Sequence, residues 1–267
     1  MNQTVIFVHI PKTAGNTLRA VLTRNCGPAR FYYREGGDLG RLEAFKRDYA
    51  TAISRFGVVG GHVYFGFHEV MTNPFRYLTM VREPVSRVVS QYRFIRSGQS
   101  GAWLKGRLDE VSLREFVERG LDETTDNCQV RRLAGLYGRY EEQPYGAARK
   151  SLLDDAWKNI CHHRILVGVQ SEFDRSLLLY RRELGWKRLP VYRNKNVTRP
   201  VKGIARKPES LATEEIEAIR AKNLLDLELY GRIDEKFGEV RQSISDRDVR
   251  RFQFLNRMIN SLAFWKK

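Results

Sequence analysis

The segment His9-Ile-Pro-Lys-Thr-Ala-Gly-Asn-Thr17 combines one lysine and two threonines with a glycine, a composition suited to binding an anion. It follows the β-rich apolar run 5–10, and the pattern of residues 13–22 predicts a helix. Backbone N–H groups at the start of a helix are unpaired, and the helix dipole adds partial positive charge there. This strand-to-helix junction therefore predicts a phosphate-binding loop.

A second strand-to-helix junction, Val81-Arg-Glu-Pro-Val-Ser-Arg-Val-Val-Ser90, also carries cationic and hydroxyl groups. Arg82 is expected at the carboxyl end of its strand, where ligands of open α/β sheets bind. On the helix predicted at 84–96, Ser90 falls outside the apolar face, on the same side as Ser86. An arginine can direct two donors to one phosphate, and a serine can donate from the helix. Two anion sites on one sheet predict a ligand with two separated phosphates.

Two other classes of function share part of this pattern. An ATP-dependent phosphotransferase would also use an α/β sheet and an anion loop, but the GxxxxGK[ST] spacing is absent: only Gly15 is present, and the lysine precedes it. A formal net charge of +16 and a pI of about 10.0 indicate an anionic partner. The basic residues are dispersed and no zinc-finger or RNP motif occurs, so a nucleic-acid-binding protein is the less favoured alternative.

The elements that must position these groups alternate between strand and helix, which predicts one α/β domain with a central, mainly parallel sheet flanked by helices. Strands are expected at 5–10, 56–59, 77–81 and 165–169. Helices are expected at 13–22, 84–96, from the Ser112 cap to Gly120, from a Ser171 cap to about Leu184, and from a Thr213 cap towards Tyr230. Residues 187–208, basic and with three prolines, are expected to form a loop. We assign residues 1–240 to the domain.

Residues 241–267 are predicted to form a basic amphipathic helix. Apolar residues recur at helical spacing among arginines: Val249, Phe252, Leu255, Ile259 and Leu262. Packing on the domain is the favoured interpretation, with a homodimer contact or an acidic membrane surface as alternatives.

The location is predicted to be cytoplasmic. Cys26, Cys128 and Cys161 are an odd number without C-x-x-C spacing, which favours a reducing compartment. No run approaches the roughly 20 apolar residues of a membrane span, and no signal-peptide pattern is present at the amino terminus.

In these motifs the chain resembles the sulfotransferases that use 3'-phosphoadenosine 5'-phosphosulfate (PAPS), especially the carbohydrate group that includes heparan sulfate 2-O-sulfotransferase and bacterial relatives. The family's Pro-Lys-Thr-small loop is matched by the segment from His9 to Gly15. Its Arg-(Asp/Glu)-Pro segment with a later serine is matched by Arg82-Glu-Pro and Ser90, and its glycine-histidine-valine by Gly61-His-Val63. The resemblance extends from about residue 4 to residue 238.

The resemblance implies a P-loop-like fold, PAPS as sulfuryl donor, PAP as product and no required metal. It implies that Arg82 and Ser90 hold the 3'-phosphate and that Lys12 and Thr13 contact the 5' end. Further donors to the 5' end would come from Ala14, Gly15, Asn16 and Thr17. The acceptor implied is a hydroxyl, in an anionic glycan or a glycolipid.

Sulfuryl transfer needs in-line geometry, stabilisation of the leaving phosphate oxygen and removal of the acceptor proton. Lys12 suits the leaving group as a cation. His62 suits the role of general base, because imidazole titrates near neutral pH and His62 follows an expected strand at the same sheet edge. His68 and Glu69 are the alternative bases.

Overall fold

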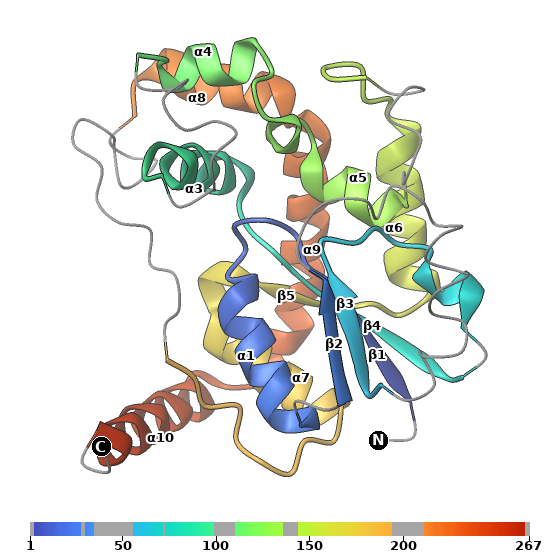
Figure 1. Cartoon of the computed structure of the whole chain (residues 1–267), viewed down its shortest axis with the longest axis vertical. Helices are drawn as coiled ribbons and strands as arrows, with labels where there is room; N and C mark the ends of the chain where they lie inside the picture. The colour runs from blue at the N-terminus through green and yellow to red at the C-terminus, as the bar shows by residue number, and fades with distance from the viewer. Residues whose placement is uncertain are drawn as a thin grey trace.

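Parallel strands form the centre of the molecule in the computed structural model (Figure 1). The structure describes residues 3–27, 30–34, 56–71, 73–98, 110–135, 144–193 and 211–264. Within them, five strands lie in the order β2 (Phe31–Arg34), β3 (Val58–Gly61), β1 (Thr4–Val8), β4 (Phe75–Val81) and β5 (Leu166–Val169). Every neighbouring pair is parallel, so the predicted α/β fold with a parallel sheet is confirmed.

The central strand β1 is buried along its whole length, which its apolar sequence Thr-Val-Ile-Phe-Val permits. Its last residue, Val8, pairs with Gly61 of β3 on one side and with Thr79 of β4 on the other. The chain leaves β1 towards β2 and β3 and then crosses to β4, so strand order reverses beside β1. Ligands of open α/β sheets bind at such a switch point, outside the carboxyl ends of the strands.

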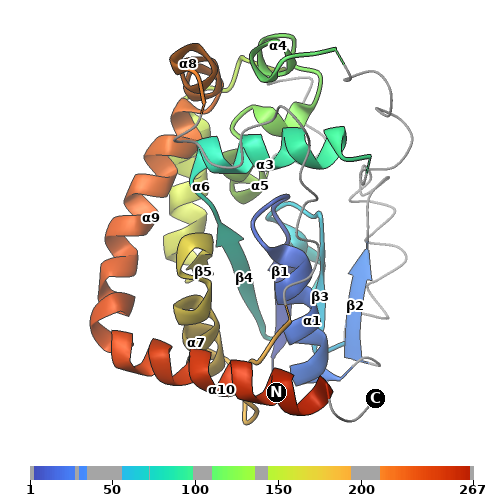
Figure 2. The ribbon, with the colours of Figure 1, turned by 90° about the vertical axis from the view of Figure 1, so that its left-hand side faces the viewer.

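Helices cover both faces of the sheet and its β5 edge. The helices up to the middle of the chain are α1 (Gly15–Cys26), α3 (Pro84–Arg96), α4 (Leu113–Glu118), α5 (Cys128–Ala134) and α6 (Ser151–His162). The later ones are α7 (Phe173–Glu183), α8 (Thr213–Lys222), α9 (Leu224–Ser243) and α10 (Asp246–Phe264). In Figures 1 and 2, α1 and α7 cover one face and α5 and α6 the other, while α9 runs along the β5 edge. Helices α3, α4 and α8 gather beyond the carboxyl ends of the strands.

Two helices begin where the sequence predicts. Helix α3 starts at Pro84, and the Glu83 carboxylate accepts hydrogen bonds from the N–H groups of Val85 (2.9 Å) and Ser86 (2.7 Å). Helix α4 follows Ser112, whose hydroxyl accepts from the N–H of Glu115 at 3.1 Å. Satisfying these otherwise unpaired N–H groups is the reason such residues start helices.

The strand expected at 56–59 runs instead from Val58 to Gly61, so the tight turn that two consecutive glycines after Val59 would suggest does not form. A β-carbon on Gly60 would lie 2.6 Å from the carbonyl oxygen of Phe7, so the glycine allows β3 to approach β1 closely. Gly61 has a φ of 149°, which disfavours other residues. Strand β2 was not predicted at all.

The predicted caps at Ser171 and Thr213 are also wrong. Residues Gln170–Glu172 form a short 3-10 helix (η6), and α7 follows Glu172. Ala212 precedes α8, and one continuous helix towards Tyr230 does not form. The helix is interrupted at Asn223, between α8 and α9, and the side-chain amide of Asn223 donates to the carbonyl of Thr125 at 2.7 Å. This tertiary contact favours a break that local sequence does not indicate. Two other 3-10 helices, η3 (Phe67–Val70) and η5 (Glu123–Thr125), were likewise not predicted.

Within the predicted tail segment 241–267, residues 241–243 belong to α9 and helix α10 begins at Asp246. It packs on the domain through Phe252, which is 2% exposed, and through Asn256 and Asn260, which bind the backbone of Tyr192 at 2.8 Å each. The predicted loop is irregular over residues 187–193, and its remainder lies outside the described residues. None of the helices that the structure describes is long and apolar enough to cross a membrane.

Candidate functional site

The site is built where β3, β1 and β4 end side by side. The segment 9–15 leaves β1 between two neighbours: Arg82 follows β4 on one side, and His62 follows β3 on the other. Because the strands are parallel, all three junctions reach the same edge of the sheet. The two motifs and the histidine recognised in the sequence are therefore brought together.

The backbone of the 9–15 segment is shaped to present N–H groups. Lys12 and Ala14 both have a φ of 67°, in the left-handed region that few non-glycine residues adopt. The Thr13 hydroxyl donates to the carbonyl of Ile10 at 2.8 Å and ties the turn together. Within the described chain, the backbone N–H groups of residues 13–16 donate to no carbonyl. A concave run of such groups at a helix start binds anions.

Gly15 is required in this loop by the position of His9. A β-carbon on Gly15 would lie 1.9 Å from Nε2 of His9, so any larger residue would displace the imidazole or the loop. His9 is buried, and its Nδ1 is hydrogen-bonded to the hydroxyl of Tyr33 on β2. Burial, followed by the charges of the surrounding basic groups, lowers the pKa of His9 well below its usual value. His9 is therefore neutral at pH 7.

Lys12 is held in a cationic and largely desolvated position. Its ammonium lies 3.7 Å from the centre of the Phe94 ring on α3. Burial is the largest cause that lowers its pKa to about 8, and the charges of the Arg82 and Arg93 guanidinium groups contribute to the same shift. Three clustered cations repel one another, so a bound anion would relieve both the repulsion and the desolvation.

Arg82 links the two anion motifs. Its Nη1 donates to the carbonyl of Lys12 at 3.1 Å, and its Nε is buried with no hydrogen-bond partner in the part of the chain that the structure describes. Burial is the largest cause that lowers the pKa of Arg82. Ser90 is half-buried on the side of α3 that also carries Ser86 and Arg93, as the sequence predicts. Each of the two motifs therefore contributes to one cationic cluster.

The backbone of Arg82 is fixed by Gln129, a residue that the sequence analysis missed. The Gln129 amide accepts from the Arg82 N–H and donates to the Arg82 carbonyl, both at 2.9 Å. Gln129 is itself placed by the buried carboxylate of Asp226, which accepts from the N–H groups of Gln129 (3.1 Å) and Val130 (2.8 Å). Helix α9 thus caps α5, and α5 positions Arg82.

His62 lies on the other side of β1 from Arg82. Its ring stacks on that of His9, with centroids 4.4 Å apart, and its Nδ1 donates to the His9 carbonyl at 3.0 Å. Because a carbonyl can only accept, this bond puts the hydrogen of the neutral imidazole on Nδ1 and the basic lone pair on Nε2. The arrangement suits proton abstraction by Nε2.

The alternative bases do not reach this edge. The Nδ1 of His68 is hydrogen-bonded to the Tyr77 hydroxyl at 2.9 Å, and its ring lies 5.1 Å from that of Phe75 at the start of β4. Glu69 follows it and is exposed. The His68 ring therefore lies beside the amino-terminal half of β4, and Glu69 is next to it in the chain. The described residues hold no group of three or more histidine, cysteine or acidic side chains placed to bind a metal.

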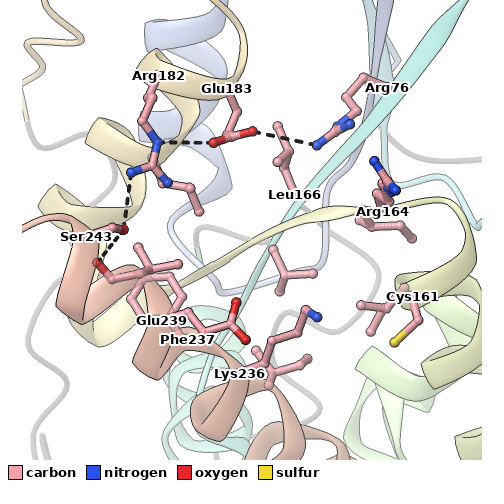
Figure 3. A pocket seen from close by; sticks show the side chains of 16 residues that line it. Arg76, Cys161, Arg164, Leu166, Arg182, Glu183, Lys236, Phe237, Glu239 and Ser243 are labelled. Carbon is pink, nitrogen blue, oxygen red and sulfur yellow. Dashed lines mark hydrogen bonds and ion pairs between the residues drawn. The ribbon is translucent and has the colours of Figure 1, made fainter.

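A cavity of about 610 Å³ lies apart from this site, between α6, α7 and α9 at the amino-terminal ends of β4 and β5 (Figure 3). Its charged residues include Arg76, Arg182 and Glu183; the Glu183 carboxylate accepts from Arg182 at 3.1 Å and lies 3.9 Å from Arg76. The site residues predicted from the sequence are all outside its lining.

A parallel sheet with a cationic cluster at its carboxyl edge suits a sulfotransferase, whose donor is anionic. Comparison with known families supports this class: the family model described as galactose-3-O-sulfotransferase matches residues 1–263. The chain belongs to that family, so it is a sulfotransferase that acts on a carbohydrate. The match does not extend to heparan sulfate 2-O-sulfotransferase in particular. A search of curated proteins finds no match.

Proposed function

We propose that the protein transfers a sulfuryl group from PAPS to the 3-hydroxyl of a galactose residue. The observation that carries the proposal is the cluster of Lys12, Arg82 and Arg93, which is desolvated and self-repelling and lies beside the open N–H groups of the 9–15 loop. PAPS carries anionic groups at both its 5' and 3' positions, so it matches two adjoining anion sites. Membership of a sulfotransferase family disfavours the kinase and nucleic-acid-binding alternatives.

On the donor side, the N–H groups of residues 13–16 and the Lys12 ammonium bind the 5'-phosphosulfate. The hydroxyl of Thr13 already donates to Ile10, so in this role Thr13 contributes its N–H. Arg82, with Ser90 on α3, holds the 3'-phosphate. As the bond between sulfur and the 5'-phosphate oxygen breaks, Lys12 stabilises the negative charge on that oxygen.

On the acceptor side, Nε2 of His62 takes the proton of the sugar hydroxyl while the oxygen forms its bond to sulfur. The products are the sulfated sugar, PAP and a protonated His62, which then releases its proton to solvent. The bond from His62 to the His9 carbonyl keeps Nε2 in the basic form before each reaction. His9 acts as a positioning residue, since it is buried and neutral.

We propose an anionic glycan or glycolipid as the molecule that bears the galactose. Two cations lie near the stacked histidines: the Arg19 guanidinium is 4.1 Å from the centre of the Tyr33 ring, and that of Arg132 is 4.9 Å from the centre of the Tyr64 ring. Both of these cations contribute to the lowered pKa of His9, so they lie within electrostatic range of the acceptor side. Positive charge there attracts an anionic acceptor.

The proposal is tested by incubating the protein with sulfur-labelled PAPS and a panel of galactosides, neutral and anionic, free and lipid-linked. We expect label in the galactosides, and linkage analysis should place it on the 3-hydroxyl. A matched acceptor with 3-deoxygalactose should receive none. Transfer to other sugars with none to galactosides, or transfer of phosphate from ATP instead, would refute the proposal.

A further inference from the structure

Helix α10 crosses the molecule at the amino-terminal edge of the sheet, opposite the candidate site (Figure 2). Only one side of it packs on the domain: Phe252 is buried, and the side chains of Gln253, Asn256 and Asn260 bind residues of α7 and of the segment after it. The helix thus covers the domain with one side and presents the other to solvent.

The solvent side of α10 carries several large apolar residues. Its large exposed residues are Phe254 (56% exposed), Met258 (44%), Ile259 (37%) and Leu262 (61%). Phe254, Met258 and Leu262 follow one another at intervals of four residues, so they form one stripe along the helix. Four of the five large hydrophobic residues that are exposed in the described chain belong to this helix, the fifth being Leu224. Such clustering indicates an interaction surface.

The charged residues of α10 beyond its first turn are all positive. Arg247, Arg250, Arg251 and Arg257 are all exposed. From Val249 to Lys267 the sequence contains five cations and no carboxylate. The acidic residues of α10, Asp246 and Asp248, lie in its first turn, where Asp246 pairs with Arg175. An apolar stripe flanked by arginines is typical of helices that lie in the interface of a membrane with anionic lipids.

We propose that the exposed side of α10 docks on an anionic lipid bilayer, with the helix parallel to the surface and its apolar stripe inserted between headgroups. The phosphates of the lipid complement the arginines. A second copy of the chain fits less well, because it would bring together two identical cationic segments on molecules that each carry a formal charge of +16. Docked in this way, the candidate site faces away from the membrane, since it lies at the opposite edge of the sheet.

The test is sedimentation of the protein with vesicles of phosphatidylcholine, alone or with about one-third phosphatidylglycerol. We expect binding to the mixed vesicles only, falling as salt is raised. Phe254→Ser/Leu262→Ser should weaken binding by about tenfold or more with an unchanged melting temperature, since both residues are exposed. Leu224→Ser, an equally exposed residue at the start of α9, is the matched control and should bind as the wild type.

Equal binding to both kinds of vesicle, or none, would overturn the proposal, and so would unimpaired binding of the double variant. Sedimentation velocity measures the oligomeric state of the wild type and of the double variant. A wild-type dimer that the double variant converts to a monomer would assign the stripe to a homodimer contact instead. Binding is measured without PAPS, so its outcome is independent of the proposed sulfuryl transfer.

Discussion

The side-chain amide of Gln129 binds both backbone groups of Arg82, accepting from its N–H and donating to its carbonyl, each at 2.9 Å. Gln129 lies in the first turn of α5 and Arg82 directly after β4, 47 residues apart in sequence. The contact holds the residue after β4 in one conformation, from which its guanidinium reaches the Lys12 carbonyl.

We expect Gln129→Glu to weaken PAP binding by about tenfold, because the carboxylate can no longer donate to the Arg82 carbonyl and repels it. Calorimetry measures the affinity, and Gln253→Glu on α10 serves as a remote control. An unchanged affinity in Gln129→Glu would mean that Arg82 does not depend on this contact.

Arg82→Ala should weaken PAP much more than adenosine 5'-phosphate, since only PAP carries a 3'-phosphate. Loss of a charge-assisted contact costs about 1.5–3 kcal/mol, or roughly ten- to a hundredfold in affinity. Lys12→Ala should weaken both nucleotides. Arg76→Ala, at the amino-terminal end of the same strand, should affect neither. Equal losses for both nucleotides in Arg82→Ala would remove Arg82 from the 3' site.

The affinity for PAP should depend on pH through Lys12. With a pKa of about 8, Lys12 is charged below that pH, where its contribution is constant. Above that pH, Lys12 of the free protein is neutral, whereas the bound phosphate favours its charged form. The affinity for PAP therefore falls as pH rises, and binding is accompanied by uptake of a proton on Lys12. Calorimetry in buffers of different ionisation enthalpy measures this uptake. Lys12→Arg, which stays charged, should bind without it; the same uptake in Lys12→Arg would point to another group.

His62→Ala should lower kcat by roughly a hundred- to ten-thousandfold with PAP affinity within a few fold, as expected for loss of a general base. His68→Ala is the control, because its ring lies at the other end of β4. Turnover is measured at saturating donor and acceptor. If His62→Ala keeps more than about a tenth of the wild-type kcat, another group accepts the proton.

Two neighbouring phenylalanines on α10 should differ sharply in their effect on stability. Phe252 is 2% exposed and Phe254 is 56% exposed. Phe252→Ala should lower the free energy of unfolding by about 3 kcal/mol, because it leaves a cavity, whereas Phe254→Ala should change it by less than about 0.5 kcal/mol. Denaturant unfolding of both variants gives the comparison. Equal effects would contradict the packing of α10 seen here.

The sequence by itself determined the features that depend on neighbouring residues. The β-rich run of β1, the Pro84 start of α3 and the Ser112 cap are local signals, and all were predicted correctly. The two anion motifs were found because strand-to-helix junctions place unpaired N–H groups and cations together within a few residues. The cytoplasmic location, the domain boundary at residue 240 and the individual roles of the site residues stay predictions from sequence.

Only the tertiary structure decided which distant residues meet. The order of the strands places His62 and Arg82 on opposite sides of β1 and leaves His68 at the other end of β4. Gln129 and Asp226 join the site through contacts between α5, α9 and the end of β4, which no local pattern encodes. The break at Asn223 has the same origin, since a buried amide bonded to Thr125 outweighs the helical pattern around it. Local propensities differ by fractions of a kcal/mol, and such buried contacts are worth more.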